Sequence, residues 1–291
     1  MASLPIQEQA TMTTRWQLAH GRHLDIGAKA LIMGILNVTP DSFSDGGKFV
    51  NPERAIEQAR RMAADGAVII DVGGESTRPG AIPVSPAEEQ ARVLPVITAL
   101  ARMDDILISV DTYREETARL AVEAGAHIVN DVWGLQREPG IARLAVDTGA
   151  GLVIMHTGRE REKKPDVIAD QFAFLQESLR IARQAGVGDE QILLDPGFGF
   201  AKDADEDLTL MARLEELHPL GFPLLVGTSR KRVIGHVSGR DFDERDVATA
   251  ATSVALRLKG AAIFRVHNVA INADALAMAD AILARTPARP V

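Results

Sequence analysis

Polar and charged side chains follow nearly every one of a series of short apolar stretches in this 291-residue chain. A single side chain of this kind is most often a helix cap or a solvated charge, but a set that recurs from stretch to stretch points to a shared site. Carboxylates, amides and cations are all present, so the set could hydrogen-bond a polar ligand and neutralise its charge. The polar positions are Asn37, Asp71, Thr77, Arg78, Asp111, Asn130, Asp131, His156, Asp195, Ser229, Lys231, Arg265 and His267, and the aromatic Phe200 follows the sixth stretch.

Four of these residues form an inner set of hydrogen-bonding groups: Asp111, Asn130, Asp195 and Lys231. Carboxylates and an amide at the bottom of a pocket suit a flat heterocycle that carries several N–H donors and ring acceptors. Buried polar groups need partners, so a ligand that satisfies them is strongly selected. The inner set therefore predicts a site for such a ring.

A second, outer set is cationic and polar, and comprises Asn37, Arg78, Arg265 and His267. Arginine matches phosphate oxygens through two parallel N–H groups. With a net charge of −8, the chain as a whole does not attract anions. An anionic ligand group must therefore be held by local cations such as these.

Simpler roles are expected for the other polar residues. Asp71 and Asp131, each taken singly, are typical of a helix cap or a loop anchor. His156 has no metal-ligand partners close in sequence, which favours packing or hydrogen bonding. The charged run 159–164 is typical of a solvated loop.

The elements that must present these residues alternate along the chain. Near-continuous apolar strands that alternate with helices are typical of a parallel sheet covered on both faces. Eight such units favour a closed (β/α)8 TIM barrel over an open doubly wound sheet, because polar residues end all eight strands, whereas an open sheet concentrates its site at one switch point. We expect strands at 31–37, 67–71, 106–111, 127–131, 152–156, 191–195, 223–227 and 262–267, and helices at 52–64, 86–103, 114–124, 139–148, 169–185, 205–218, 244–259 and 270–284.

The remaining features bound the class of protein. Residues 1–12 are expected to form a loose leader, and residues 13–291 a single barrel domain that opens with a short hairpin at 13–27 closing the bottom of the barrel. There are no cysteines, so disulfides and thiolate zinc sites are excluded. The net negative charge argues against a surface that binds nucleic acid. No apolar run is long enough for a membrane span. No secretory leader is recognisable, so we expect a cytoplasmic protein.

Several longer motifs then resemble one family. The loops at 34–47 and 71–81 are closely similar to the two signature loops of the dihydropteroate synthase family. Five further motifs fit the same family in the same order, so that the similarity runs from about Met33 to His267. They are Ser109–Thr112, Ile128–Asp131, Leu194–Phe200, Gly227–Lys231 and Arg265–His267.

The resemblance implies an enzyme that condenses 6-hydroxymethyl-7,8-dihydropterin diphosphate with 4-aminobenzoate. It also implies a Mg²⁺ ion near Asn37 and a homodimer built through barrel helices. One departure from the family pattern is Asn268, which stands where aspartate is usual. By motif, the pterin would be bound by Asp111, Asn130, Asp195 and Lys231 in a slot lined by Val132, Met155 and Gly227; the diphosphate by Asn37, Arg78, Arg265 and His267; and the aminobenzoate by Thr77, Pro79, Phe200, Ser229 and Lys231.

Two alternatives share parts of this pattern. A pterin-binding methyltransferase domain would share the barrel and the inner set, but would not need Ser229, Lys231 or the loop at Thr77–Arg78. A weakly active, pterin-binding paralogue would share nearly all of the motifs. Formation of dihydropteroate from the two substrates separates the three possibilities.

Overall fold

The computed structural model describes residues 13–38, 52–75 and 84–285. Thr77, Arg78 and Pro79, three of the residues expected at the site, lie outside the described residues, as do residues 1–12 of the expected leader. The division of the chain into a leader and one domain therefore stays a prediction.

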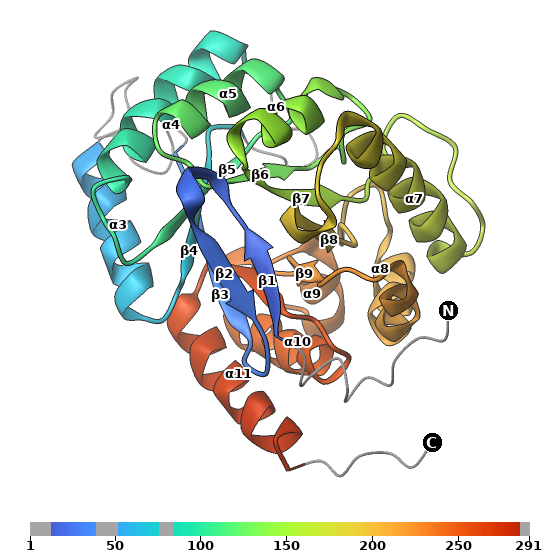
Figure 1. The fold of residues 1–291 in the computed structure, drawn as a ribbon. Helices are drawn as coiled ribbons and strands as arrows, with labels where there is room; N and C mark the ends of the chain where they lie inside the picture. The colour runs from blue at the N-terminus through green and yellow to red at the C-terminus, as the bar shows by residue number, and fades with distance from the viewer. Residues whose placement is uncertain (1–12, 39–51, 76–83, 286–291) are drawn as a thin grey trace.

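Eight parallel strands form the centre of the molecule, in the order β8-β7-β6-β5-β4-β3-β10-β9 (Figure 1). A parallel bridge between Leu194 and Leu224 joins the two ends of this sheet, so it closes into the expected barrel. The strands are β3 (Leu31–Asn37), β4 (Ile69–Gly73), β5 (Leu107–Asp111), β6 (Ile128–Asp131), β7 (Gly151–Met155), β8 (Ile192–Asp195), β9 (Leu225–Val226) and β10 (Ile263–Val266).

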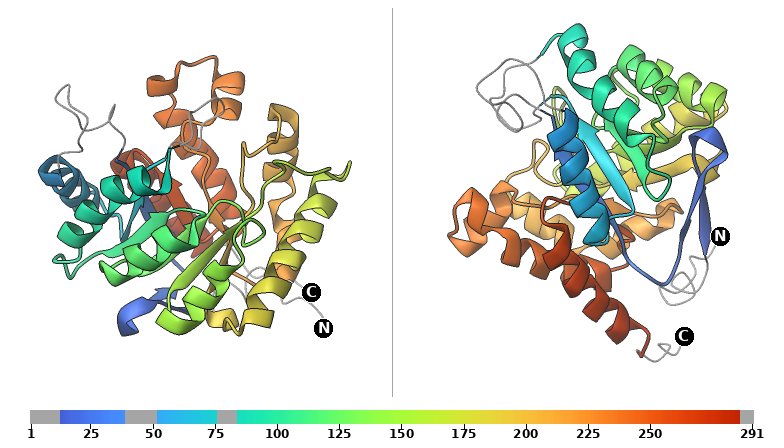
Figure 2. Two further views of the ribbon diagram at one scale, coloured as in Figure 1. Left: turned by 90° about the horizontal axis from the view of Figure 1, so that it is seen from above. Right: turned by 90° about the vertical axis from the view of Figure 1, so that its left-hand side faces the viewer.

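Helices surround the barrel on its outside (Figures 1 and 2). They are α3 (Pro52–Ala64), α4 (Pro86–Leu100), α5 (Glu115–Glu123), α6 (Gly140–Thr148), α7 (Val167–Ala185), α8 (Ala204–Ala212), α9 (Arg232–Ser238), α10 (Asp246–Leu258) and α11 (Val269–Leu283). Short 3-10 helices occur at η1 (Ala19–Gly21), η2 (Asp189–Gln191), η3 (Leu214–Leu220) and η4 (Phe242–Glu244).

Two parts of the helical layer differ from the expectation. The helix expected at 205–218 is divided, because Arg213 leaves the helical region and the 3-10 helix η3 follows it. The short helix α9 between β9 and α10 was not expected. Gly239, with φ at +68°, ends it after seven residues, which is too short to show a clear apolar period.

The N-terminal hairpin closes the bottom of the barrel, as predicted. Strands β1 (Thr14–Gln17) and β2 (His23–Ile26) pair antiparallel and lie across one end of the barrel (Figures 1 and 2). The indole of Trp16 is buried, and its Nε1 donates to the carbonyl of Gln191 at 2.8 Å. Trp16 and Ile26 pack on the apolar residues that fill the lower barrel, such as Met33 and Ile69.

The core has two layers, one inside the barrel and a larger one between the strands and the helices. The apolar strands are buried on both faces, which explains why they read as continuous rather than alternating runs. Within the described segments, no helix is both long and apolar enough to cross a membrane.

Candidate active site

The side chain of Arg265 connects the ends of three strands at the mouth of the barrel. From β10, its Nε donates to Asp71 Oδ2 on β4 at 2.6 Å, and its Nη2 donates to Asp111 Oδ2 on β5 at 2.7 Å. Asn130 at the end of β6 donates from Nδ2 to the same oxygen of Asp71 at 3.1 Å. Parallel strands whose carboxyl ends meet at one edge therefore bring these four residues together.

Asp71 belongs to this cluster, whereas the sequence taken residue by residue favoured a role as a cap or anchor. Its side chain is completely buried and accepts from both Arg265 and Asn130. A signal was present: a carboxylate that ends an apolar strand is buried, and a buried carboxylate needs a cation. Asp131, by contrast, is the loop anchor that was expected, since it accepts from the backbone N–H groups of Trp133 and Leu135.

Several buried polar atoms of the cluster have no partner among the described residues. They are Asp71 Oδ1, Asn130 Oδ1 and the hydroxyl of the neighbouring Ser109. A buried acceptor without a donor costs free energy, so such atoms usually face a ligand or water. Oxygens that lack donors are what a ring with N–H groups would satisfy.

Burial dominates the electrostatics of the mouth. It raises the pKa of Asp111 to about 7, against the opposing effect of Arg265, and it also raises the pKa of Asp195. Burial alone would lower the pKa of Arg265, but Asp71 and Asp111 raise it above its ordinary value, so the guanidinium stays charged. The mouth thus holds a fixed cation beside a carboxyl group that can change its charge near neutral pH.

Lys231 follows β9, the strand next to β10, and so lies near Arg265 at the mouth. Its ammonium donates to the carbonyl of Phe198 and lies 4.7 Å from the centre of the Phe200 ring. Burial lowers the pKa of Lys231 to about 8, although Asp195 and another carboxylate oppose this. Gly227 lies between the two cations: a Cβ atom there would be 3.7 Å from Arg265 Cβ and 3.9 Å from Lys231 Nζ.

An apolar shelf adjoins these polar groups. Val132, Met155 and Phe200 are buried together, with Tyr113 and Trp133 packed against them at its edge. Two of the three, Val132 and Met155, are residues expected to line the pterin slot. A flat ring could lie on this shelf while its edge faces the polar cluster.

The structure places the described residues of the outer set, His267, Asn37 and Arg265, in different surroundings. Ser229 and His267 are paired, with 2.9 Å between Ser229 Oγ and His267 Nδ1, and the His267 backbone N–H donates to the same hydroxyl. Asn37 lies at the end of β3, beside Gly73. Arg265, which the sequence placed in the outer set, lies instead against the inner carboxylates. Its expected role toward a diphosphate stays a prediction.

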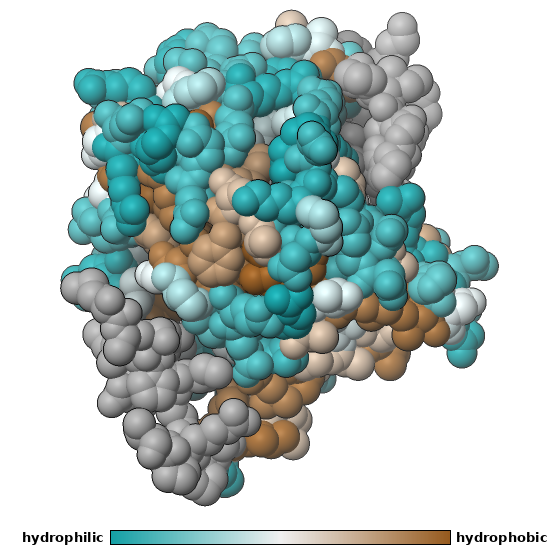
Figure 3. Space-filling view, turned by 90° about the vertical axis from the view of Figure 1, so that its right-hand side faces the viewer, coloured by the Kyte–Doolittle hydropathy of each residue, from teal (hydrophilic) through white to brown (hydrophobic). Residues whose placement is uncertain are grey.

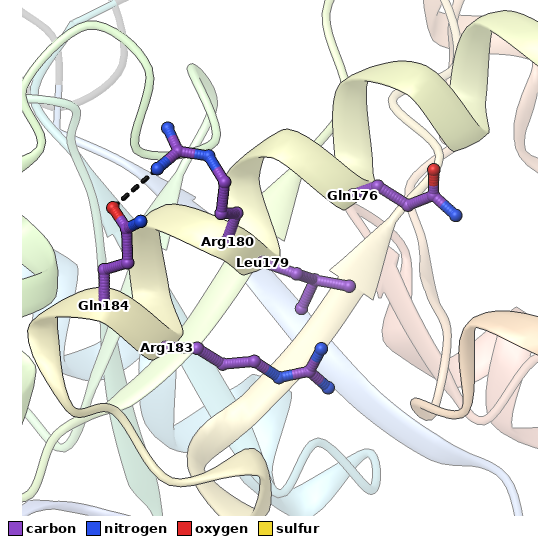
Figure 4. A pocket seen from close by; sticks show the side chains of 5 residues that line it. All are labelled: Gln176, Leu179, Arg180, Arg183 and Gln184. Atoms are coloured by element: carbon purple, nitrogen blue, oxygen red, sulfur yellow. Dashed lines mark hydrogen bonds between the residues drawn. The ribbon is translucent and has the colours of Figure 1, made fainter.

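A separate hollow lies on helix α7. It measures about 420 Å³ and is lined only by residues of α7, among them Leu179, Arg180 and Arg183 (Figure 4). This hollow is on the outside of the barrel, away from the strand ends. We therefore define the site by the convergent polar groups of the mouth.

Asn268, which departs from the family pattern, makes two side-chain hydrogen bonds that suit an amide. Its Nδ2 donates to Asp246 Oδ2 at 2.9 Å, while its Oδ1 caps α11 by accepting from the Ile271 N–H. Asp246 also accepts from Arg230, and the hydrogen bond from Arg230 lowers its pKa. An amide can serve both partners, whereas a carboxylate would face Asp246 with a like charge.

Asn268→Asp should therefore destabilise the fold by about 1 kcal/mol at pH 7, the net worth of one hydrogen bond. The charge of Asp246 raises the folded-state pKa of the new carboxyl group above its unfolded value, so the loss is largest near pH 7 and fades as the pH falls toward 4. Urea unfolding at pH 4 and pH 7 measures this. Asn268→Ser, which keeps the cap without a charge, is the control, and an equal loss for both variants at both pH values would contradict the explanation.

Comparison with known proteins agrees with this geometry. The family model described as "Pterin binding enzyme" matches residues 33–267. Dihydropteroate synthase of Bacillus subtilis is 48% identical over 255 residues, which cover 88% of this chain and 89% of the relative. The corresponding protein of Clostridium beijerinckii is 44% identical over 265 residues, covering 91% of this chain and 98% of the relative.

Solved structures give the same result. Xanthomonas albilineans dihydropteroate synthase with 4-aminobenzoic acid superposes with a TM-score of 0.88 at 41% identity, covering 94% of this chain and 100% of that one. The Clostridium difficile enzyme in the presence of pteroic acid has a TM-score of 0.86 at 46% identity, covering 89% of this chain and 98% of that one.

An eight-stranded parallel barrel with carboxylates and an amide at its mouth defines the class of pterin-binding barrel enzymes. The chain belongs to the pterin-binding enzyme family, and within it to the dihydropteroate synthases. It is accordingly a transferase of folate biosynthesis.

Proposed function

We propose that the barrel mouth is where the chain condenses 6-hydroxymethyl-7,8-dihydropterin diphosphate with 4-aminobenzoate, giving 7,8-dihydropteroate and diphosphate. The observation that carries this proposal is the pair of buried acceptors, Asp71 Oδ1 and Asn130 Oδ1, that lack donors among the described residues. They lie beside Asp111, and the apolar shelf of Val132 and Met155 adjoins the mouth. This combination of an acceptor-rich wall and an apolar shelf fits a flat ring with several N–H groups.

In this proposal the pterin ring is bound by the inner set. Asp111, Asn130 and Asp195 accept its N–H groups, and Lys231 donates to a ring acceptor. Because strand ends are the most rigid part of a barrel, these groups are held in place before the ligand arrives. The pterin ring lies against the apolar shelf, and Gly227, which has no side chain, leaves room between Arg265 and Lys231.

The diphosphate is assigned to Arg265, His267 and Asn37. Arg265 already uses Nε and Nη2 for carboxylates, which leaves its Nη1 to donate toward an anion. His267 contacts Ser229, which is assigned to the aminobenzoate, so the diphosphate and aminobenzoate sites adjoin at this pair. Arg78 is assigned to the same group by its motif and lies in the segment 76–83, outside the described residues.

Two oxygens on either side of the end of β4, from Asn37 on β3 and Asp111 on β5, would fit a Mg²⁺ ion. Asn37 Oδ1 and Asp111 Oδ2 lie 3.6 and 3.7 Å from the position that a Cβ on Gly73 would occupy, so the missing side chain leaves room between two oxygens. In the described part of the chain, no group of three or more His, Asp or Glu residues could hold a metal ion. Mg²⁺ is commonly bound through one or two protein oxygens, substrate phosphates and water, so two oxygens from the chain would be enough to hold it. When bound, the ion would neutralise charge on the leaving diphosphate.

The aminobenzoate is assigned to Ser229, Lys231 and Phe200, together with Thr77 and Pro79 of the segment outside the described residues. Phe200 offers a ring face, and Lys231 lies above that face. A cation next to an aromatic surface suits an aromatic carboxylate. Its amine needs positioning more than deprotonation, because a neutral aromatic amine is already a nucleophile.

The reaction is then a displacement at the methylene carbon of the pterin. The amine nitrogen forms the new C–N bond, the C–O bond to diphosphate breaks with its electron pair on the leaving oxygen, and the surplus amine proton is released. Positive charge develops on the pterin as the leaving group departs. Asp111 and Asp195 stabilise that charge, while Arg265 stabilises the diphosphate.

Purified protein should form dihydropteroate and diphosphate in equal amounts from the two substrates when Mg²⁺ is present. Chelation with EDTA should lower the rate more than about tenfold, and added Mg²⁺ should restore it. No dihydropteroate under any condition would overturn the proposal in favour of a methyltransferase domain or an inactive paralogue. An undiminished rate in EDTA would contradict the proposed role of Mg²⁺.

We also infer a homodimer formed through α10 and α11, which lie side by side on the outside of the barrel. Helix α11 has apolar residues on its exposed face as well as its buried one: Met278 is 63% and Ile282 52% exposed, and Leu258 on α10 is 42% exposed. Figure 3 shows apolar residues along the lower edge of the molecule. Exposed apolar patches of this kind mark interaction sites. Sedimentation should give twice the 31.3 kDa mass of the chain, and Met278→Glu should halve it.

A cytoplasmic location remains a further proposal, in keeping with a biosynthetic enzyme without cysteines. Fractionation of cells that produce the protein tests it, and recovery from the secreted or envelope fraction would contradict it.

A further inference from the structure

A buried lysine that has no part in the proposed reaction lies directly behind the mouth. Lys202, between β8 and α8, is 3% exposed. Its Nζ donates to the Gly197 carbonyl at 2.8 Å and lies 2.9 Å from His156 Nδ1. We propose that Lys202 and His156 are positioning residues for Lys231, acting through the segment Gly197–Phe200. This inference rests on the proposed role of Lys231 in pterin binding.

The protonation of His156 follows from its partners. Burial lowers the pKa of Lys202 to about 7, so below that pH the group is an ammonium, which has only donors. His156 Nδ1 is then the acceptor and carries no proton. The hydrogen is then on Nε2, which donates to Asp170 Oδ2 at 3.0 Å. Burial lowers the pKa of His156 to about 3, which keeps the ring neutral. A neutral ring with one donor and one acceptor connects Asp170 to Lys202 in a fixed order.

Helix α7 anchors the far end of this chain of hydrogen bonds. Arg161 donates to both oxygens of Asp170, at 2.9 and 2.5 Å, and to the Thr157 carbonyl at 2.7 Å. Its Nη2 also approaches His156 Nε2, but two donors cannot bond to each other, so both point at Asp170. Arg161 belongs to the run expected to be a solvated loop; instead it bonds to a buried carboxylate.

The segment that Lys202 holds is the one that contacts the mouth. The Phe198 carbonyl accepts from the Lys231 ammonium, and the Gly197 N–H donates to Asp195 Oδ1 at 2.7 Å. Gly197 has φ at +64°, and a Cβ there would come within 1.9 Å of the His156 carbonyl. The segment is therefore pressed against His156, and the Lys202 bond to Gly197 sets the position of the carbonyl that receives Lys231.

Charge gives a reason for a lysine in this place. Lys202 and Lys231 are two buried amines near two carboxylates, Asp195 and Asp207. Burial lowers the pKa of Lys202 to about 7 and that of Lys231 to about 8, and the two carboxylates oppose this by favouring the charged amines. Asp207 in turn accepts from the Gly199 N–H at 2.8 Å. The four charges balance, so each lysine can stay buried without an unpaired partner. Removing Lys202 would leave the segment short of both a donor and a positive charge.

A double-mutant cycle tests whether Lys202 acts through Lys231. Affinity for 6-hydroxymethyl-7,8-dihydropterin is measured by calorimetry in the wild type, Lys202→Met, Lys231→Met and the double variant, with kcat and KM where activity allows. Lys202→Met should weaken pterin binding by about 10- to 100-fold, the size of effect that a misplaced binding group produces. In the Lys231→Met background the same substitution should cost less than about threefold. Lys259→Met, which removes a lysine paired with Glu215 away from the mouth, is the control and should keep wild-type affinity.

The outcomes are distinct. Normal affinity in Lys231→Met alone would overturn the proposed role of Lys231, whatever Lys202 does. An equal loss from Lys202→Met in both backgrounds would overturn the positioning role, because Lys202 would then act on the fold as a whole. If Lys202→Met does not fold, ¹⁵N NMR of histidine in the wild type at pH 6, below the pKa of Lys202, decides, with the signal assigned from a His156→Gln variant. A hydrogen on Nε2 alone supports the inference, and a hydrogen on Nδ1 overturns it.

Discussion

Asp111→Ala should lower the affinity for the dihydropterin ring by about 2–3 kcal/mol, or roughly 30- to 150-fold, while the barrel still folds. The substitution removes a charged acceptor from the wall of the mouth and also one of the two carboxylates that fix Arg265. Calorimetric titration of the unphosphorylated pterin measures the loss directly. Circular dichroism of the same sample shows whether the fold is kept.

The pH dependence of binding offers a second test of Asp111. Burial raises its pKa in the free protein to about 7, and the N–H groups of a pterin need the ionised form as acceptor. Pterin affinity should therefore rise as the pH increases from 6 toward 8, and should fall again above pH 8 as Lys231 loses its charge. Asp111→Asn cannot titrate, so its affinity should be low and nearly constant across this range.

A matched control comes from another buried ion pair. Asp280 pairs with Arg257 at 2.6 Å and accepts from the Ala30 N–H near the start of β3, at the end of the barrel opposite the mouth. Asp280→Ala should cost stability but leave pterin affinity unchanged. If Asp111→Ala also binds pterin normally, or if Asp280→Ala binds it equally weakly, Asp111 is not a pterin ligand.

Arg265→Ala should have the largest effect on stability, because it leaves Asp71 and Asp111 buried without their cation. Breaking a buried pair in this way costs about 3–5 kcal/mol. Without the guanidinium, the folded-state pKa of Asp111 rises further above its unfolded value. The folded state then binds protons more readily than the unfolded state, so the loss is larger at pH 8 and shrinks as the pH falls toward 5. Urea unfolding at the two pH values gives the comparison.

The same variant separates the two roles of Arg265. If Arg265 also holds the diphosphate, Arg265→Ala should weaken binding of the diphosphorylated pterin much more than that of the unphosphorylated alcohol. Arg265→Lys retains a charge but not the fork that reaches two carboxylates, so it should recover only part of the stability. Equal losses for the two ligands would restrict Arg265 to holding the carboxylates.

The sequence predicted the barrel and the strand ends because both rest on local patterns. Apolar runs that alternate with helices indicate parallel strands, and a polar residue at the end of each run is visible without any structure. Asp111, Asn130, Asp195 and Arg265 are strand-end residues for this reason. The short motif around Arg265 could not show that its side chain lies against the inner carboxylates, because those partners are more than 150 residues away in the sequence.

Other features depend on contacts that no local pattern reveals. The Lys202–His156 contact joins residues 46 positions apart, on two different loops. His156 alone offered only a histidine at a strand end, and Lys202 only a lysine after a glycine-rich turn. Arg161 likewise looked like a solvated charge, because its partner Asp170 is brought close only by the first turn of α7.

The most direct test of the central claim is a crystal structure of the protein with pteroic acid bound. We expect the pterin ring in the barrel mouth on the shelf of Val132 and Met155, with its N–H groups about 2.7–3.2 Å from oxygens of Asp111, Asn130 and Asp195. A ring bound elsewhere, such as the outer hollow on α7, or a ring in the mouth that leaves these oxygens to water, would contradict the assignment of the site.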